Sequence, residues 1–183
     1  MTLALGFDPG FGDGRLGWAV VESSSLRTRV LDFGTLRRLP SGDDERRLDV
    51  IAAFVLDRVG HSGASTDVVG YEDQAGMLAS HDPEEWRGGS FASRRVLEVC
   101  GIIRCAAAHY GKPCIVVHSS TAKKTLTGSG RAKKADVQTA CERLFGVRGA
   151  SSHACDAIAI ALTALRVWQA RELVRQYPAK VKP

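Results

Sequence analysis

Long apolar runs and paired cysteines are both missing from this sequence of 183 residues. No apolar run reaches the ~18 residues that a membrane span needs, and the short N-terminal run meets Asp8 too early for a signal peptide. The cysteines are odd in number, scattered and without a C-x-x-C pair: Cys100, Cys105, Cys114, Cys141 and Cys155. We therefore expect a soluble cytoplasmic protein with no membrane partner, whose reduced thiols form neither disulfides nor a zinc site.

Acidic residues are missing from residue 99 to residue 135, although the net charge of the whole chain is a modest +5. The cations in that stretch are Arg104, Lys112, Lys123, Lys124, Arg131, Lys133 and Lys134. Unopposed cations of this kind favour one basic face that binds a polyanion. The alternative is that these side chains form only a solvated surface.

The composition that is present is that of an ordinary globular domain, with 44% hydrophobic and 25% charged residues. Such values indicate neither a disordered chain nor a membrane protein. The length suffices for one domain with a proper core, which we expect over residues 1–173. A basic, proline-broken tail over residues 174–183 is expected to be loose.

The first strand is expected over residues 3–10, where an apolar run ends abruptly in Asp8-Pro9-Gly10. A carboxylate at the end of a buried strand costs free energy unless a cation or hydrogen bonds compensate it. The alternative is that Asp8 is an ordinary turn residue before Pro-Gly. Two more apolar stretches, 18–22 and 30–36, follow with short links, and the three together predict an antiparallel meander.

Further elements alternate along the rest of the chain. We expect an amphipathic helix over 44–59, a strand over 67–72, a loop or partly helical flap over 73–93, and a helix over 94–109. The last of these is apolar on most of its circumference, so it is either buried on both sides or part of an oligomer interface. Beyond it the pattern predicts a strand over 112–118 and a helix over 134–145 that buries Val137, Cys141, Leu144 and Phe145.

The final helix is expected to begin near Ser151 or Ser152, because both residues are good N-caps. The resulting order of elements predicts an α/β protein with a mixed five-stranded sheet and helices on both faces. The meander would lie at one side of the sheet, with parallel crossovers after it.

Four side chains at structural boundaries are candidates for one site: Asp8, Glu72, His153 and Asp156. If the first and fourth strands are parallel neighbours, Asp8 and Glu72 emerge at the same end of the sheet. His153 and Asp156 are three residues apart and therefore share a helix face. Taken singly, Glu72 could be a surface acid, His153 a helix-start residue bonded to backbone, and Asp156 an acid favoured by the helix dipole.

Together these groups would favour an oxygen-rich metal site, because crowded carboxylates repel one another without a cation. Such ligands suit Mg²⁺ or Mn²⁺, and two such ions about 4 Å apart can activate water and stabilise the leaving oxygen of a phosphodiester. The hypothesis is therefore a two-metal nuclease.

Four motifs strengthen this interpretation: GFDPG at 6–10, YEDQ at 71–74, STAKKTLTGSGRAKKADVQ at 120–138 and HACDAIAIAL at 153–162. In this order they resemble the motifs of the RuvC family of Holliday-junction resolvases, over roughly residues 3–165. The resemblance implies an RNase H-like fold, a homodimer, paired metal-dependent nicks across a four-way DNA junction, and a branch-migration motor as a further partner. It places Asp8, Glu72, His153 and Asp156 at the metal-binding catalytic positions. It also implies that DNA lies on the basic segment, and we expect Lys123, Lys124, Arg131, Lys133 and Lys134 to contact it.

Two features depart from the family pattern. An aromatic wedge commonly follows the second acid, where this chain has Asp73, Gln74, Ala75 and Gly76, and the segment between Glu72 and Gly101 is about ten residues longer than usual. The alternative functions are an RNase H-like nuclease for RNA or other branched DNA, an actin-like ATPase or sugar kinase, which needs two such domains, and a non-catalytic DNA-binding module.

Overall fold

An antiparallel meander forms one side of the sheet, as predicted. The computed structural model describes residues 1–60, 66–73 and 90–177. β1 (Thr2–Asp8), β2 (Gly17–Ser23) and β3 (Thr28–Thr35) pair in chain order, so that Asp8 lies opposite Gly17 and Gly17 opposite Thr35. β1 stops at Asp8 because Pro9, which follows it, has no backbone N–H to donate.

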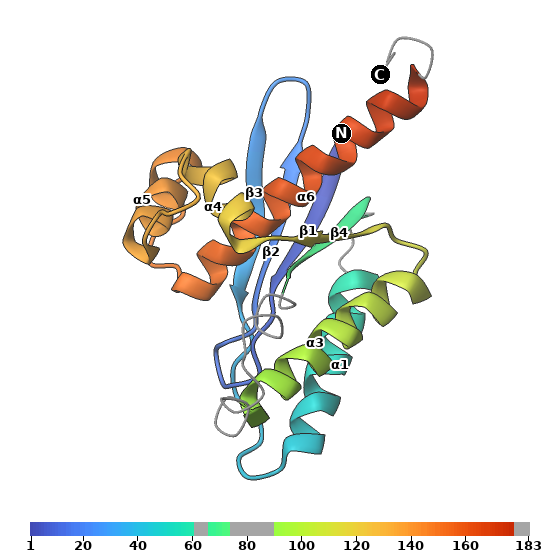
Figure 1. The fold of residues 1–183 in the computed structure, drawn as a ribbon, viewed down its shortest axis with the longest axis vertical. Coiled ribbons are helices and arrows are strands. Elements are labelled where there is room, and N and C mark those ends of the chain that lie inside the picture. The colour runs from blue at the N-terminus through green and yellow to red at the C-terminus, as the bar shows by residue number, and fades with distance from the viewer. Residues whose placement is uncertain (61–65, 74–89, 178–183) are drawn as a thin grey trace.

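The other two strands extend the sheet on the far side of β1. β4 (Val68–Glu72) pairs parallel to β1, and β5 (Cys114–Val117) pairs parallel to β4, which gives the strand order β3-β2-β1-β4-β5 (Figure 1). The last residues of β1, β3, β4 and β5 and the first residue of β2 consequently share one end of the sheet. We call it the carboxyl end.

Helices cover both faces of the sheet, which confirms the predicted α/β architecture. α6 (Ser152–Gln176) crosses one face, with α4 (Ser119–Thr127) and α5 (Lys134–Phe145) beside its first turns (Figure 1). α1 (Asp44–Gly60) and α3 (Ser90–His109) pack together on the other face (Figure 1). Alternate side chains of β1 supply the two cores, Ala4 toward α6 and Leu3, Leu5 and Phe7 toward α1 and α3.

Small residues let α6 lie directly on the sheet. A Cβ atom on Gly6 would overlap the backbone of Ala157 and Ala161, and one on Gly17 would overlap the carbonyl group of His153. Glycine is required where two backbones approach this closely. The approach fixes the first turn of α6 against the strand ends that carry Asp8 and Glu72.

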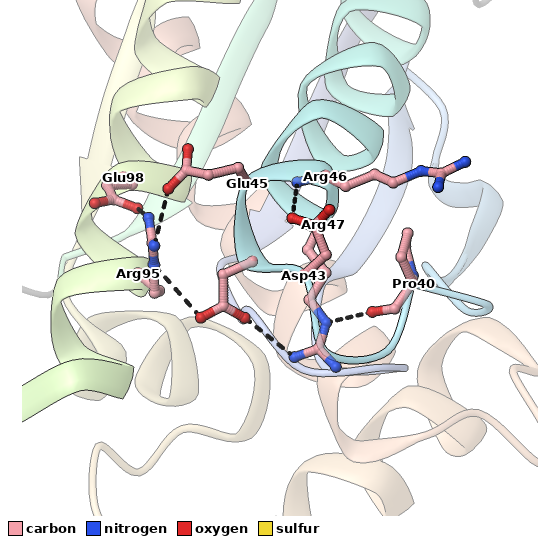
Figure 2. Close-up of polar contacts among 8 residues, drawn as sticks. Pro40, Asp43, Glu45, Arg46, Arg47, Arg95 and Glu98 are labelled. Atoms are coloured by element: carbon pink, nitrogen blue, oxygen red, sulfur yellow. Dashed lines mark hydrogen bonds and ion pairs between the residues drawn. The ribbon is translucent and has the colours of Figure 1, made fainter.

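Ion pairs tie the N-terminal ends of α1 and α3 together (Figure 2). Arg95 of α3 contacts Glu45 at 3.0 Å and Glu98 at 2.7 Å, and its guanidinium also lies 5.9 Å from the ring centroid of Phe11. Arg47 of α1 lies 5.8 Å from the same ring and donates to the carbonyl of Pro40. The turn that follows Asp8 is thereby held between two arginines.

Several boundaries differ from the sequence prediction. The nine-residue helix α4 was not expected, α3 begins at Ser90 inside the predicted 73–93 loop, and α6 continues through Gln176 into the predicted tail. Leu144 was predicted to be buried but is 51% exposed, because α5 turns Val137, Ala140 and Cys141 toward α6. Residues 74–89 of the predicted 73–93 flap lie outside the described residues.

The cysteines agree with the prediction of reduced thiols. Cys100, Cys141 and Cys155 are buried, Cys114 is half-buried and Cys105 is exposed, and all five are free. None of the helices in the described residues is long and apolar enough to cross a bilayer.

Candidate active site

Asp8 is a buried carboxylate at the carboxyl end of the central strand, with only 7% of its surface exposed. Burial raises its pKa to about 7; the hydrogen bond from His153 works against this rise, and the charges of Glu72 and Asp156 add to it. A carboxylate with two acidic neighbours in such a place is an unstable arrangement without a cation. The structure therefore contains the buried carboxylate whose free-energy cost the sequence predicted at Asp8.

His153 meets Asp8 directly. Ser151 caps α6 by accepting a hydrogen bond from the backbone N–H of Ala154 at 3.1 Å, so His153 stands in the first turn. Its Nδ1 atom lies 2.6 Å from Oδ2 of Asp8. This hydrogen bond raises the pKa of His153, against the lowering effect of partial burial.

Glu72 and Asp156 complete the group of four. Phe7 pairs with Tyr71 across the parallel strands, and the next residue of each strand is Asp8 and Glu72. Burial raises the pKa of Asp156, and the charge of Glu72 raises it further. Glu72 and Asp156 line one small pocket together with Lys123, Ser119, Ala122 and Ile160.

The donors present fit a hard divalent cation. Three carboxylates and one imidazole lie together at the carboxyl end, and the three carboxylates repel one another. A bound cation would relieve this repulsion, which adds to the effect of burial in raising the pKa of Asp8 and of Asp156. In the part of the chain that the structure describes, no three of these groups already meet as a complete ligand set. The side chains are gathered but not closed around one point.

Two basic residues of the segment 120–138, Lys123 and Lys134, lie beside this group. Lys123 on α4 lines the pocket, and the charges of Lys123 and Lys134 both lower the pKa of Asp156 against the effect of burial. Lys124, Arg131 and Lys133 are exposed on α4 and on the turn into α5. Lys123 and Lys134 therefore lie at the site, and the other three cations are exposed on the same segment of the chain.

The other two cations of the acid-free stretch lie elsewhere, so the prediction of one basic face was too broad. Arg104 on α3 faces Tyr71, where burial raises the pKa of the phenol and Arg104 partly offsets the rise. Lys112 precedes β5 and lies at the opposite end of the sheet. The sequence pattern alone could not separate these two cations from the others, because β5 passes through the sheet between them and α4.

Two groups next to the site were not predicted. His118 follows β5 and its Nε2 atom lies 3.3 Å from Oδ2 of Asp73, the residue after Glu72. The backbone N–H of Asp73 donates to the carbonyl of Val117 at 2.8 Å, which sets this register. A polar residue directly after each apolar strand was the available signal. The remaining positions without the aromatic wedge, Gln74 to Gly76, lie outside the described residues.

Comparisons with known proteins agree with this geometry. A family model described as "Crossover junction endodeoxyribonuclease RuvC" matches residues 93–164. The proteins of the same name from Zymomonas mobilis and Moorella thermoacetica are 30% identical over 167 residues (87% of each chain) and 29% identical over 177 residues (93% of this chain, 96% of the relative).

Solved structures give the same result. The structure of T. thermophilus RuvC in complex with a Holliday junction substrate has a TM-score of 0.72 and 26% identity over 93% of this chain and 97% of its own. A second Thermus thermophilus RuvC structure has a TM-score of 0.68 and 27% identity over 93% of this chain and 96% of its own. The chain has the RNase H-like fold and belongs to the RuvC family of crossover junction endodeoxyribonucleases.

Proposed function

We propose that this nuclease resolves four-way DNA junctions by paired hydrolysis of phosphodiesters. The proposed active site consists of Asp8, Glu72, His153 and Asp156. The observation that carries the proposal is the gathering of these four side chains at the carboxyl end of the sheet, beside Lys123 of α4 and Lys134 of α5. A related RuvC with the same fold was solved with a Holliday junction substrate, which supports the choice of DNA. The resemblance of the segment 120–138 to the resolvase motif also argues against RNA as the substrate.

Each residue has a distinct part in the proposed reaction. Asp8, Glu72, His153 and Asp156 would hold two Mg²⁺ or Mn²⁺ ions, which supply water activation and stabilisation of the leaving oxygen. Asp8 provides a carboxylate whose position is fixed by strand pairing, and its bond to Nδ1 fixes the ring of His153. Lys123 in the pocket and Lys134 on α5 favour a phosphate next to the acids, because they offset the repulsion between the polyanion and the carboxylates.

We further propose a homodimer, since paired nicks need two active sites. α3 buries Val99, Ile103 and Ala106 against its own sheet, while Gly101, Cys105 and Ala108 are exposed on its outer side. A helix face of small exposed residues, with the charged Glu98 and Arg104 beside them, fits a second copy of the chain. A branch-migration motor as partner and a cytoplasmic location belong to the same proposal.

Cleavage of three labelled substrates by the wild-type protein tests the proposal: a four-way junction, a matched duplex and an RNA–DNA hybrid, each with Mg²⁺ or Mn²⁺. We expect nicks in the junction, symmetrically placed on opposing strands, and little cutting of the other two. Preferential cutting of the hybrid would instead support a nuclease for RNA. Binding of the junction without any cutting would support a non-catalytic module.

A further inference from the structure

A groove lies beside the active site, on the β3 side of the sheet, where the loop that joins α5 to α6 forms one of its walls. It has a volume of about 260 Å³ and runs between the end of β3 and the first turn of α6. Gly34, Gly149 and Ala150 leave it open, and Thr35, Arg37 and Ser151 supply its polar groups. This volume is below that of typical small-molecule sites, which measure ~300–1,000 Å³, so the groove suits a short piece of a larger ligand.

The register of the sheet sets the distance from this groove to the catalytic group. Asp8 lies opposite Gly17, and Gly17 lies opposite Thr35, so two strand spacings separate Asp8 from Thr35. Strands are ~4.8 Å apart, which makes the separation about 10 Å. Ser151 and Ala154 of the groove also flank His153, which bonds to Asp8.

Arg37 lines the groove, and two further cations lie in turns that adjoin the end of β3. Arg37 is exposed and its Nε atom donates to Oγ1 of Thr35 at 3.4 Å, which holds the guanidinium over the end of β3. Arg15 and Arg38 are exposed in the two adjoining turns, and neither forms an ion pair within the ranges that the structure describes. Asp13 is the nearby acid, and its carboxylate accepts the backbone N–H of Leu39.

The backbone that carries these arginines is held in place. Leu36 donates to the carbonyl of Leu16 at 2.9 Å and accepts from the N–H of Gly14 at 2.8 Å. Arg38 adopts a φ of +65°, a left-handed conformation that a residue with a side chain keeps only when its surroundings impose it. The cations are therefore presented by a fixed turn and not by a free loop.

We propose that this groove binds the backbone of the cut DNA strand on the β3 side of Asp8, across the sheet from β5 and α4, with Arg37 as the phosphate contact. The inference rests on the proposed function and extends it. At an axial rise of ~3.4 Å per nucleotide, a separation of about 10 Å corresponds to about three nucleotides from the cut. Arg37 on one side and Lys123 of α4 on the other would then hold one DNA strand across the catalytic group.

The experiment measures junction binding without divalent cations, using a set of junctions. Each junction carries a single neutral methylphosphonate, placed from one to five nucleotides from the cut on either side. For the wild-type protein, we expect a methylphosphonate about three nucleotides away on one side to weaken binding. For Arg37→Ala, the same substitution should have no further effect. Between 50 and 200 mM salt, the wild-type protein should also lose about threefold more affinity than Arg37→Ala, as one fewer phosphate contact requires.

Arg27→Ala is the matched control, since Arg27 is an exposed arginine in the β2–β3 hairpin at the opposite end of the same strands. It should keep the wild-type methylphosphonate profile and salt dependence. If Arg37→Ala behaves as Arg27→Ala does while the wild-type protein cuts junctions, the groove does not bind the strand and this inference alone is overturned. A wild-type protein that neither binds nor cuts junctions would overturn the proposed function itself, and the inference with it.

Discussion

At the scale of single residues, the burial of Asp8 has a cost that depends on pH. Burial raises the pKa of Asp8 from 3.8 to about 7, so the folded protein binds this proton more tightly than the unfolded chain does. The contribution of Asp8 to stability is therefore fully present below about pH 4 and is lost as the pH rises toward 7. Above that range the folded state carries a buried charge that a metal ion would compensate.

Asp8→Asn should accordingly raise the melting temperature of the metal-free protein at pH 8 and change it little at pH 4. The expected gain is several degrees, since about 1 kcal/mol corresponds to ~2–4 °C for a domain of this size. Thermal denaturation in EDTA at both pH values measures it, and Asp49→Asn, an exposed acid of α1, is the control. A variant that melts below the wild type at pH 8 would show that Asp8 is compensated by the protein alone.

His153 gives a second prediction at this scale. Imidazole is a softer ligand than carboxylate and suits Mn²⁺ better than Mg²⁺, so the wild-type protein should cut faster with Mn²⁺ at equal free metal. His153→Asp should keep activity and narrow the ratio of the two rates. Rates of junction cleavage in both metals decide the matter, and an identical ratio in the two proteins would remove His153 from the ligands.

At the scale of elements, α4 and α5 are expected to provide the main phosphate contacts. Lys123→Ala and Lys134→Ala should each reduce the slope of log K against log[salt] by about 0.9 in magnitude, if each lysine contacts one phosphate. Lys112→Ala is the control because Lys112 lies at the other end of the sheet. Slopes that stay at the wild-type value in both variants would mean that the lysines are a solvated surface.

The elements also show which features a sequence can predict. The strands and α1 could be predicted because apolar runs and periodic faces end at clear breakers, as at Asp8-Pro9-Gly10. α4 was missed because its nine residues bury only Ala122 and Leu126, too few for a recognisable period, and it depends on packing against α6. Leu144 was assigned to the core because helical periodicity shows which residues share a face. It does not show how many of those residues the neighbouring helix covers.

The residues of the candidate site could be predicted from the sequence, but several contacts around them could not. Asp8 and Glu72 could be paired because parallel strands end together, and His153 with Asp156 because they share a helix turn. The contact between His118 and Asp73 depends on the register of β4 and β5, and the groove beside Arg37 depends on the close approach of α6. Neither register nor approach is encoded in a local pattern.

At the scale of the whole molecule, the exposed side of α3 predicts a dimer. The wild-type protein should sediment as a dimer at micromolar concentration, and Cys105→Glu should give a folded monomer, because the side chain is already exposed in the single chain. That monomer should make single nicks in place of pairs. Val174→Glu, on the exposed end of α6, is the control and should remain dimeric. A wild-type monomer that makes paired nicks would contradict this arrangement.

The most direct measurement is the incision of a cruciform carried on a supercoiled plasmid, where paired nicks across the junction give linear DNA and single nicks give an open circle. With Mg²⁺ or Mn²⁺, we expect the wild-type protein and Asp49→Asn to produce linear DNA. Asp8→Asn, Glu72→Gln and Asp156→Asn should leave the plasmid supercoiled while still binding the junction. Linear product at near the wild-type rate from any of these three variants would contradict the assignment of that residue to the catalytic group.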